Sequence, residues 1–279
     1  MTELLARPVR PWALRLLPPF PAVANRVLAL VNDEDVAARQ ISEIIQLDPT
    51  FTAEILRVAN SALFGLAREI ATVRHAVSLL GLDRVKAIGT LIALHSMVKP
   101  AMRMEALRKI WIHSLVTAML TEETARAAQL SVEGAYTAGM LHNLGTLGLM
   151  SVYPEEYTRM LEVTAECGFD VVETERELFE IDHCTAGACL AEEWSFPEVI
   201  VQAIATHHQE PGPVSSLAAA VRVAWRLGDV LGFAAFPPDR FWSQQELLDL
   251  IPGVPATWMA GDLDVVQAQV RSRLNAYTA

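Results

Sequence analysis

The stretch of this sequence that most constrains its fold is Gly139-Met140-Leu141-His142-Asn143-Leu144-Gly145, which lies in mid-chain between two apolar segments. A core that buries polar side chains such as His142 and Asn143 without partners loses about 1–3 kcal/mol for each of them. The flanking glycines allow a close approach of backbone or ligand, or a positive φ angle. The chain must therefore fold so that this polar pair finds partners inside an apolar environment.

Two interpretations of the pair are open. It can be a turn between two helices that holds a hydrogen-bonded core histidine. It can also be the centre of a metal-dependent hydrolase site, in which a His-Asp pair ligates the metal. Here the second residue is Asn143 and not aspartate. The function depends on that difference.

The spacing of apolar residues predicts an all-α protein. Apolar side chains recur with helical period along most of the chain, whereas few segments alternate with period two, so we expect no sheet. Capping residues, prolines and glycines mark the helix ends. We expect helices over residues 22–31, 36–46, 49–60, 72–81, 83–98, 103–129, 131–142, 154–168, 171–181, 197–206, 216–231 and 262–275, with further helical segments after Asp182 and Ser243.

Composition limits the classes of protein to which the chain can belong. With 279 residues, 52% of them hydrophobic, it can bury a sizeable core in one large domain or two modest ones. A net charge of −11 argues against non-specific binding to nucleic acid. The longest uncharged apolar run, Ala87 to Val98, is too short to span a bilayer. The prolines near the N-terminus argue against a signal peptide, and three cysteines without Cys-x-x-Cys spacing fit a reducing compartment. We expect a soluble cytoplasmic protein.

Four motifs together resemble one family. Asp48–Gly65 is similar to the signature of the HDOD (HD-related output domain) family. The family's next element, Ala-Val-x-x-Leu-Gly-Leu-Asp-x-Val, is matched by Ala76–Val85. Trp111-x-His113-Ser114 and Ala138–Gly145 follow in the same order. The resemblance covers roughly Leu16 to Leu231, which is most of the chain.

The resemblance implies an HDOD-type multi-helix fold and a bacterial cytoplasmic role in signal transduction. We expect a lead-in segment at residues 1–15 and an HDOD domain at residues 16–231. Within that domain an N-terminal helical bundle, about 16–100, would pack on an HD-like helical half, about 101–231. A C-terminal helical extension would occupy residues 232–279. Members of the family generally lack a complete set of catalytic metal ligands.

The ligand positions of active HD hydrolases can be carried over residue by residue. His113 matches the first histidine and His142 the second, but Asn143 stands at the position of the adjacent aspartate. Trp225 stands at the position of a later aspartate. An asparagine brings no negative charge to retain a dication, and a tryptophan is no ligand and would crowd the cavity. The resemblance therefore implies a degenerate metal site.

Other residues keep the case for a metal open. His183, His207 and His208 match additional ligand positions of multi-metal HD relatives. Asp229 lies four residues after Trp225, on the same face of the expected helix, and could partly replace a missing carboxylate. Neighbouring helical residues diverge by about 100°, so His207 and His208 converge only if the helix ends there.

An aromatic group of residues lies beyond the expected helix 216–231. Phe233, Phe236, Phe241 and Trp242 cluster near two prolines, in a segment without clear helical spacing. The cluster either folds back to cover the bundle or forms an exposed interaction patch.

The sequence thus predicts a non-catalytic signalling module that binds a protein partner or a small effector, with no cofactor and no contact with nucleic acid or membrane. The alternative is a divergent metal-dependent HD phosphohydrolase that acts on a nucleotide or cyclic dinucleotide and holds a divalent transition metal. A third possibility is a purely structural helical adaptor. The oligomeric state is left open. Candidate ligands, if a metal binds, are His113, His142, Asn143, His183, His207, His208 and Asp229.

Overall fold

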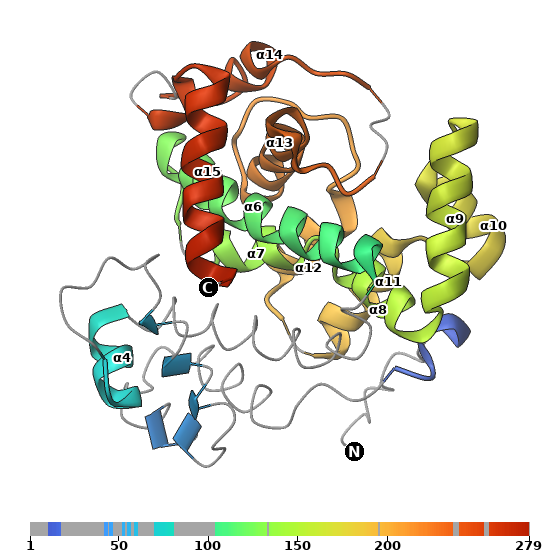
Figure 1. The fold of residues 1–279 in the computed structure, drawn as a ribbon, viewed down its shortest axis with the longest axis horizontal. Coiled ribbons are helices and arrows are strands. Elements are labelled where there is room, and N and C mark those ends of the chain that lie inside the picture. The colour runs from blue at the N-terminus through green and yellow to red at the C-terminus, as the bar shows by residue number, and fades with distance from the viewer. Residues whose placement is uncertain are drawn as a thin grey trace, which may run out of the picture.

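The computed structural model describes residues 11–17, 70–80, 104–132, 134–194, 196–236, 240–253 and 257–278, with five pairs of residues between 42 and 60. Every regular element in these ranges is helical, which confirms the predicted all-α class (Figure 1). The α-helices are α4 (Val73–Leu80), α6 (Glu105–Ala127), α7 (Ala135–Leu141), α8 (Leu144–Val152), α9 (Pro154–Cys167), α10 (Val171–Phe179), α11 (His183–Glu193), α12 (Glu198–Thr206), α13 (Leu217–Gly228), α14 (Gln244–Leu248) and α15 (Leu263–Thr278). Two 3₁₀ turns, η1 (Trp12–Leu14) and η6 (Trp258–Ala260), and a π-helical turn, η4 (Asp229–Phe233), complete the set.

Helix α6 is the centre of the fold. Its 23 residues pack against α7 and α13, while α11 packs against α8 and α12. Figure 1 shows α6 passing through the middle of the molecule, with α15 lying across it and α9 and α10 to one side. Most of α6 from Ile110 to Thr121 is buried, and this face includes polar residues such as His113. A polar group in such a position must be held by neighbouring elements.

Several predicted helix ends are confirmed. Pro154 is the first residue of α9, and Gly168 ends that helix in the left-handed conformation. The Asp182 side chain caps α11 by accepting a hydrogen bond from the Thr185 N–H. Ser243 and Glu246 form the predicted capping box at the start of α14.

Some boundaries were predicted wrongly, and α8 was not among the expected helices. The helix expected from residue 131 begins at Ala135, because Gly134 has a φ of 71° and lies outside the helix. The α-helix expected to reach residue 231 ends at Gly228 and continues as the π-helical turn η4. The helices expected at 22–31 and 83–98 lie outside the described residues.

Two glycines of the central motif allow close helix packing. A Cβ at Gly139 would lie 2.6 Å from the Ala118 Cα, so α7 can approach α6 only because none is present. A Cβ at Gly145 would lie 1.9 Å from the carbonyl oxygen of His183, at the contact between α8 and α11. The sequence expectation of a close backbone approach is met at both positions.

Segments outside the central helices are fixed to them by specific contacts. The Trp12 ring packs edge-on against Tyr153, and its Nε1 donates a hydrogen bond to Glu180. At the other end of the chain, Gln267 on α15 donates a hydrogen bond to the Leu231 carbonyl oxygen at 2.8 Å. None of the described helices combines the length and the apolar character needed to cross a bilayer.

Candidate functional site

Five histidines from four parts of the chain form one buried cluster. The ring centroids of His113 and His142 are 5.4 Å apart, and those of His142 and His207 are 5.1 Å apart. His183 lies 5.1 Å from His207, and His208 lies 4.7 Å from both. All but the partly buried His208 have no exposed surface. The folding of the chain therefore brings together all five histidines that the sequence singled out.

Helix ends orient two of these rings. His142 directly follows α7 and donates from Nδ1 to the Gly139 carbonyl oxygen at 2.6 Å. His207 directly follows α12 and donates from Nδ1 to the Ile204 carbonyl oxygen at 2.7 Å. The last carbonyls of a helix lack partners within it, so each ring satisfies one of them. Because α12 ends at Thr206, His207 and His208 do converge.

A buried carboxylate orients the third ring. His183 is the first residue of α11, where the backbone N–H has no partner within the helix. The Glu175 carboxylate on α10 accepts hydrogen bonds from this N–H at 2.8 Å and from the ring Nδ1 at 2.7 Å. The Tyr157 hydroxyl on α9 donates to the other carboxylate oxygen. Three elements therefore set the position of His183.

The π-helical turn orients the fourth ring. His113 on α6 donates from Nδ1 to the Phe233 carbonyl oxygen at 2.8 Å, and Asp229 Oδ1 lies 3.5 Å from the same nitrogen. Both partners belong to η4. Turns of this kind occur frequently at functional sites. Asp229 therefore meets the cluster at His113.

These contacts fix which ring nitrogen carries the proton. Carbonyl and carboxylate oxygens accept hydrogen bonds, so the Nδ1 atoms of His113, His142, His183 and His207 act as donors. In the neutral rings the Nε2 atoms then carry lone pairs. The Nε2 atoms of His113, His142 and His208 have no hydrogen-bond partner among the described residues.

Burial sets the electrostatics of most of the cluster. It lowers the pKa of His113 to about 4, against a small opposing effect of the Phe233 carbonyl. Burial, with the charges of neighbouring histidines, holds the pKa of His142, His207 and His208 well below the ordinary value. These four rings are therefore neutral at pH 7.

His183 differs from the other four histidines. Burial pulls its pKa down, but the charges of Glu175 and Cys184 outweigh that effect and raise the pKa well above the ordinary value. The negative charge of the buried Glu175 carboxylate is thus the main cause that raises the pKa of this ring.

Aromatic rings form the walls of the cluster. The Trp225 ring lies 4.5 Å from the His208 ring and 5.9 Å from the His207 ring. Phe236 stacks on His183 with centroids 5.8 Å apart and is buried. Phe241, by contrast, is 88% exposed, so one member of the predicted aromatic group covers the bundle and another faces solvent.

The remaining candidates contribute less. Asn143 is fully buried beside His142, and neither atom of its amide has a hydrogen-bond partner in the described part of the chain. Arg226 donates hydrogen bonds to the backbone carbonyls of His207 and His208 at 3.4 and 3.3 Å, which fixes the turn that carries these two rings.

Two residues of the site were missed by sequence reasoning. Glu175 lies between Val171 and Phe179 on the buried face of α10, and a glutamate on an apolar i, i+4, i+8 stripe is the signal that could have identified it. The sequence placed Cys184 only among the three cysteines that fit a reducing compartment. Its Sγ lies 3.8 Å from His207 Nδ1 and faces the cluster.

The residues present do not fit the two-carboxylate metal centre of active HD hydrolases. Asn143 supplies a neutral amide at one aspartate position, and Trp225 places an indole ring against His208 from the other. The imidazoles near them are neutral. A dication held there would find no carboxylate at either aspartate position, so this arrangement supports no hydrolytic step.

Comparison with known proteins gives one family and several similar folds. The HDOD domain family matches residues 17–210, more than half of the chain. An uncharacterised protein of Treponema pallidum (strain Nichols) is 24% identical over 197 residues, 70% of this chain and 38% of that protein. The chain thus spans well under half of the length of this curated relative.

Solved structures share the fold. A "Putative phosphohydrolase" of Shewanella amazonensis SB2B superposes with a TM-score of 0.71 at 24% identity, over 94% of this chain and 93% of that one. An HDOD domain protein of unknown function from Geobacter sulfurreducens gives a TM-score of 0.70 at 24% identity, over 94% and 90%. A "Putative signal transduction protein" of Marinobacter aquaeolei VT8 gives 0.68 at 24% identity, over 93% of this chain and 57% of that one.

Proposed function

The chain belongs to the HDOD family, and on this premise we propose that it is a non-catalytic signalling module that binds a protein partner or a small effector. The family assignment supports a place in signal transduction. The choice between binding and catalysis depends on the residues of the histidine cluster.

One observation carries the proposal. The Trp225 ring lies 4.5 Å from the His208 ring, at the position where the resemblance to HD hydrolases places an aspartate. An indole offers one N–H donor and no lone pair for a metal. The ring also occupies space beside His208 that a metal-bound hydroxide would need. A binding role needs neither the ligand nor the water.

The names of similar structures point in both directions. One is a "Putative phosphohydrolase" and another a "Putative signal transduction protein", and both are 24% identical to this chain. Similarity of this degree supports a common fold and does not choose between the two activities. Asn143 and Trp225 favour the binding role.

The experiment compares hydrolysis and binding with one purified protein. Phosphodiester turnover is measured with a chromogenic diester and with cyclic dinucleotides, in the presence of Mn²⁺, Fe²⁺ or Ni²⁺. The same nucleotides are screened by thermal shift, and partners are captured from the native host. We expect no turnover, together with either a ligand that raises Tm or a partner that binds in stoichiometric amounts. Turnover that is lost in His142→Ala would contradict the proposal.

A further inference from the structure

His183 and His207 face each other through ring nitrogens inside the cluster. Their Nε2 atoms lie 3.2 Å apart. Each ring already donates from Nδ1, to Glu175 in one case and to the Ile204 carbonyl in the other. In the metal-free protein the contact therefore needs one further proton, which lies on one Nε2 and is donated to the lone pair of the other. A metal cation bound by both nitrogens would displace that proton.

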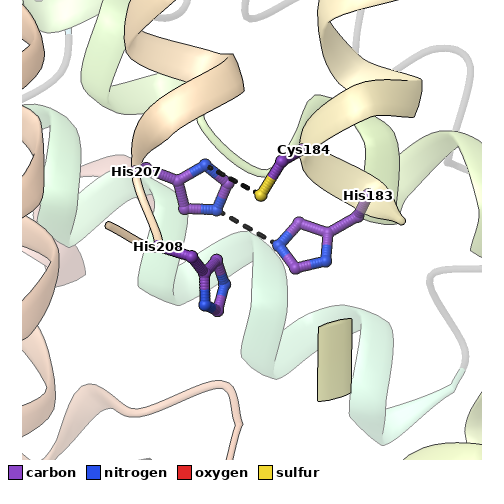
Figure 2. A group of neighbouring side chains, drawn as sticks. All are labelled: His183, Cys184, His207 and His208. Carbon is purple, nitrogen blue, oxygen red and sulfur yellow. Dashed lines mark hydrogen bonds between the residues drawn. The ribbon is translucent and has the colours of Figure 1, made fainter. Parts of the chain in front are cut away.

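Two further ligand atoms lie within reach of these nitrogens. One ligand atom from each of His183, Cys184, His207 and His208 lies within 4.8 Å of the other three. Figure 2 shows the His183 and Cys184 side chains of α11 facing His207 and His208, which follow α12. The His208 Nε2 has no hydrogen-bond partner in the part of the chain that the structure describes. Three imidazoles and a thiol thus converge on one small volume.

We propose that His183, Cys184, His207 and His208 form a closed, four-coordinate site for a borderline-soft divalent cation of the zinc class. Zn²⁺ takes histidine nitrogen at about 2.0–2.1 Å and thiolate sulfur at about 2.3 Å in tetrahedral geometry. Those bond lengths put ligand atoms about 3.3–3.8 Å apart. The two Nε2 atoms, 3.2 Å apart, are already near that separation. The other ligand atoms, which lie up to 4.8 Å apart, reach it if side-chain rotation moves them by about 1 Å.

The local charges match a dication. A coordinated Cys184 is a thiolate with one negative charge. The Glu175 carboxylate behind His183 accepts three hydrogen bonds, from Tyr157 and from the backbone and ring of His183, as an acceptor-only carboxylate does. The two negative charges balance a dication. A carboxylate that fixes the Nδ1–H of a ligating histidine is also the usual outer partner in zinc sites.

This site differs from the hydrolytic centre of HD enzymes in its ligands and in the role that the metal would have. It uses neither the Asn143 position nor the Trp225 position. Sulfur selects zinc over the harder manganese and magnesium ions. Four protein ligands leave no open position for water, which is the arrangement of a structural site. The metal would stabilise the junction of α11 and α12 and would agree with a non-catalytic role.

The test uses the full chain, freed of metal by chelation and titrated separately with Zn²⁺ and Co²⁺ under reducing conditions. We expect one metal per chain. The Co²⁺ form should show a thiolate-to-cobalt charge-transfer band and the intense visible bands of tetrahedral cobalt. Cys184→Ser should abolish the charge-transfer band, whereas the matched control Cys189→Ser, on the same helix, should keep it. Glu175→Gln should weaken zinc binding about 10–100-fold.

The spectrum of the unmodified protein already tests the proposal if a variant fails to fold. Absence of stoichiometric zinc in that protein would overturn it. So would a cobalt spectrum without a sulfur band, or a band that survives Cys184→Ser. A ¹⁵N spectrum of the imidazoles that shows protons on both nitrogens of His183 after zinc addition would also overturn it, because a proton and not a metal would then separate the rings. Phosphodiester turnover tests the proposed function and leaves this result unaffected.

Discussion

The Glu175 carboxylate accepts hydrogen bonds from both the backbone N–H and the ring Nδ1–H of His183, at 2.8 and 2.7 Å. Both residues are completely buried. The contact joins α10 to the first turn of α11, and a hydrogen bond from Tyr157 joins α9 to the same carboxylate. One side chain therefore connects three helices on one side of the histidine cluster.

Glu175→Ala should lower the free energy of unfolding by about 3–5 kcal/mol in metal-free protein, because it leaves buried donors on His183 and Tyr157 without an acceptor. Urea unfolding at pH 7.5 measures the change. Tyr157→Phe removes only one donor to the carboxylate, and we expect a loss of about 1.5–3 kcal/mol. If both variants unfold at the wild-type midpoint, the carboxylate does not support the packing of these helices.

Gly145→Ala should separate α8 from α11. The added Cβ would lie 1.9 Å from the His183 carbonyl oxygen and 2.6 Å from the Gly187 nitrogen, both of which are backbone atoms that cannot rotate away. Overpacking of this kind costs about 1–3 kcal/mol or more. Gly212→Ala is the matched control, since a Cβ there meets no atom within 4 Å. Thermal unfolding of both variants makes the comparison, and equal midpoints would show that the helices are not in contact at Gly145.

Acid should destabilise the protein before the carboxylates titrate. The pKa of His113 is about 4 in the folded chain against an ordinary value of 6.5, because the ring is buried. Below pH 6.5 the His113 ring binds a proton in the unfolded chain, whereas in the folded chain it binds one only near pH 4. The contribution of His113 to the free energy of unfolding is therefore complete above pH 6.5. It falls as the pH decreases toward 4, by up to about 1.4 kcal/mol per pH unit.

Urea unfolding of metal-free protein between pH 7.5 and pH 4.5 measures this slope. Below pH 6.5 the lowered pKa values of His142, His207 and His208 act in the same direction, so the wild-type slope there should exceed that of one group. The raised pKa of His183 acts in the opposite direction only above pH 6.5, because its contribution is complete below that pH. His113→Leu removes one contribution and should flatten the curve. A stability that stays constant or rises as the pH falls from 6.5 to 4.5 would contradict the neutral state of the four rings with lowered pKa values.

The sequence predicted what depends on local pattern. Apolar spacing gave α6 to within a few residues, and the capping residues Asp182 and Ser243 marked helix starts that the structure confirms. The resemblance selected all five histidines that meet in the cluster. The Gly134 conformation and the π-helical turn after Gly228 were not predicted, because neither follows from helical spacing.

What the sequence could not supply was the pairing of distant groups. Nothing in the order of residues shows that the Phe233 carbonyl accepts from His113, 120 positions away. The thiol of Cys184 faces His207 only because α11 packs against α12. Such contacts depend on tertiary packing, which single-sequence patterns do not encode.

The neutral side chains at the two aspartate positions lead to a final prediction. Asn143→Asp should destabilise metal-free protein by about 3 kcal/mol, because the new carboxylate is buried without a cationic partner. Mn²⁺ should not restore stability, since Trp225 still lies against the His207 and His208 rings. The double variant Asn143→Asp/Trp225→Asp removes that ring and adds a second carboxylate, so its Tm should rise with Mn²⁺ concentration. Thermal shift with and without Mn²⁺ makes the comparison, with wild type as the control. An equal Mn²⁺-dependent rise in wild type would mean that the cluster holds a hard divalent metal without those carboxylates, and the case for a non-catalytic module would fail.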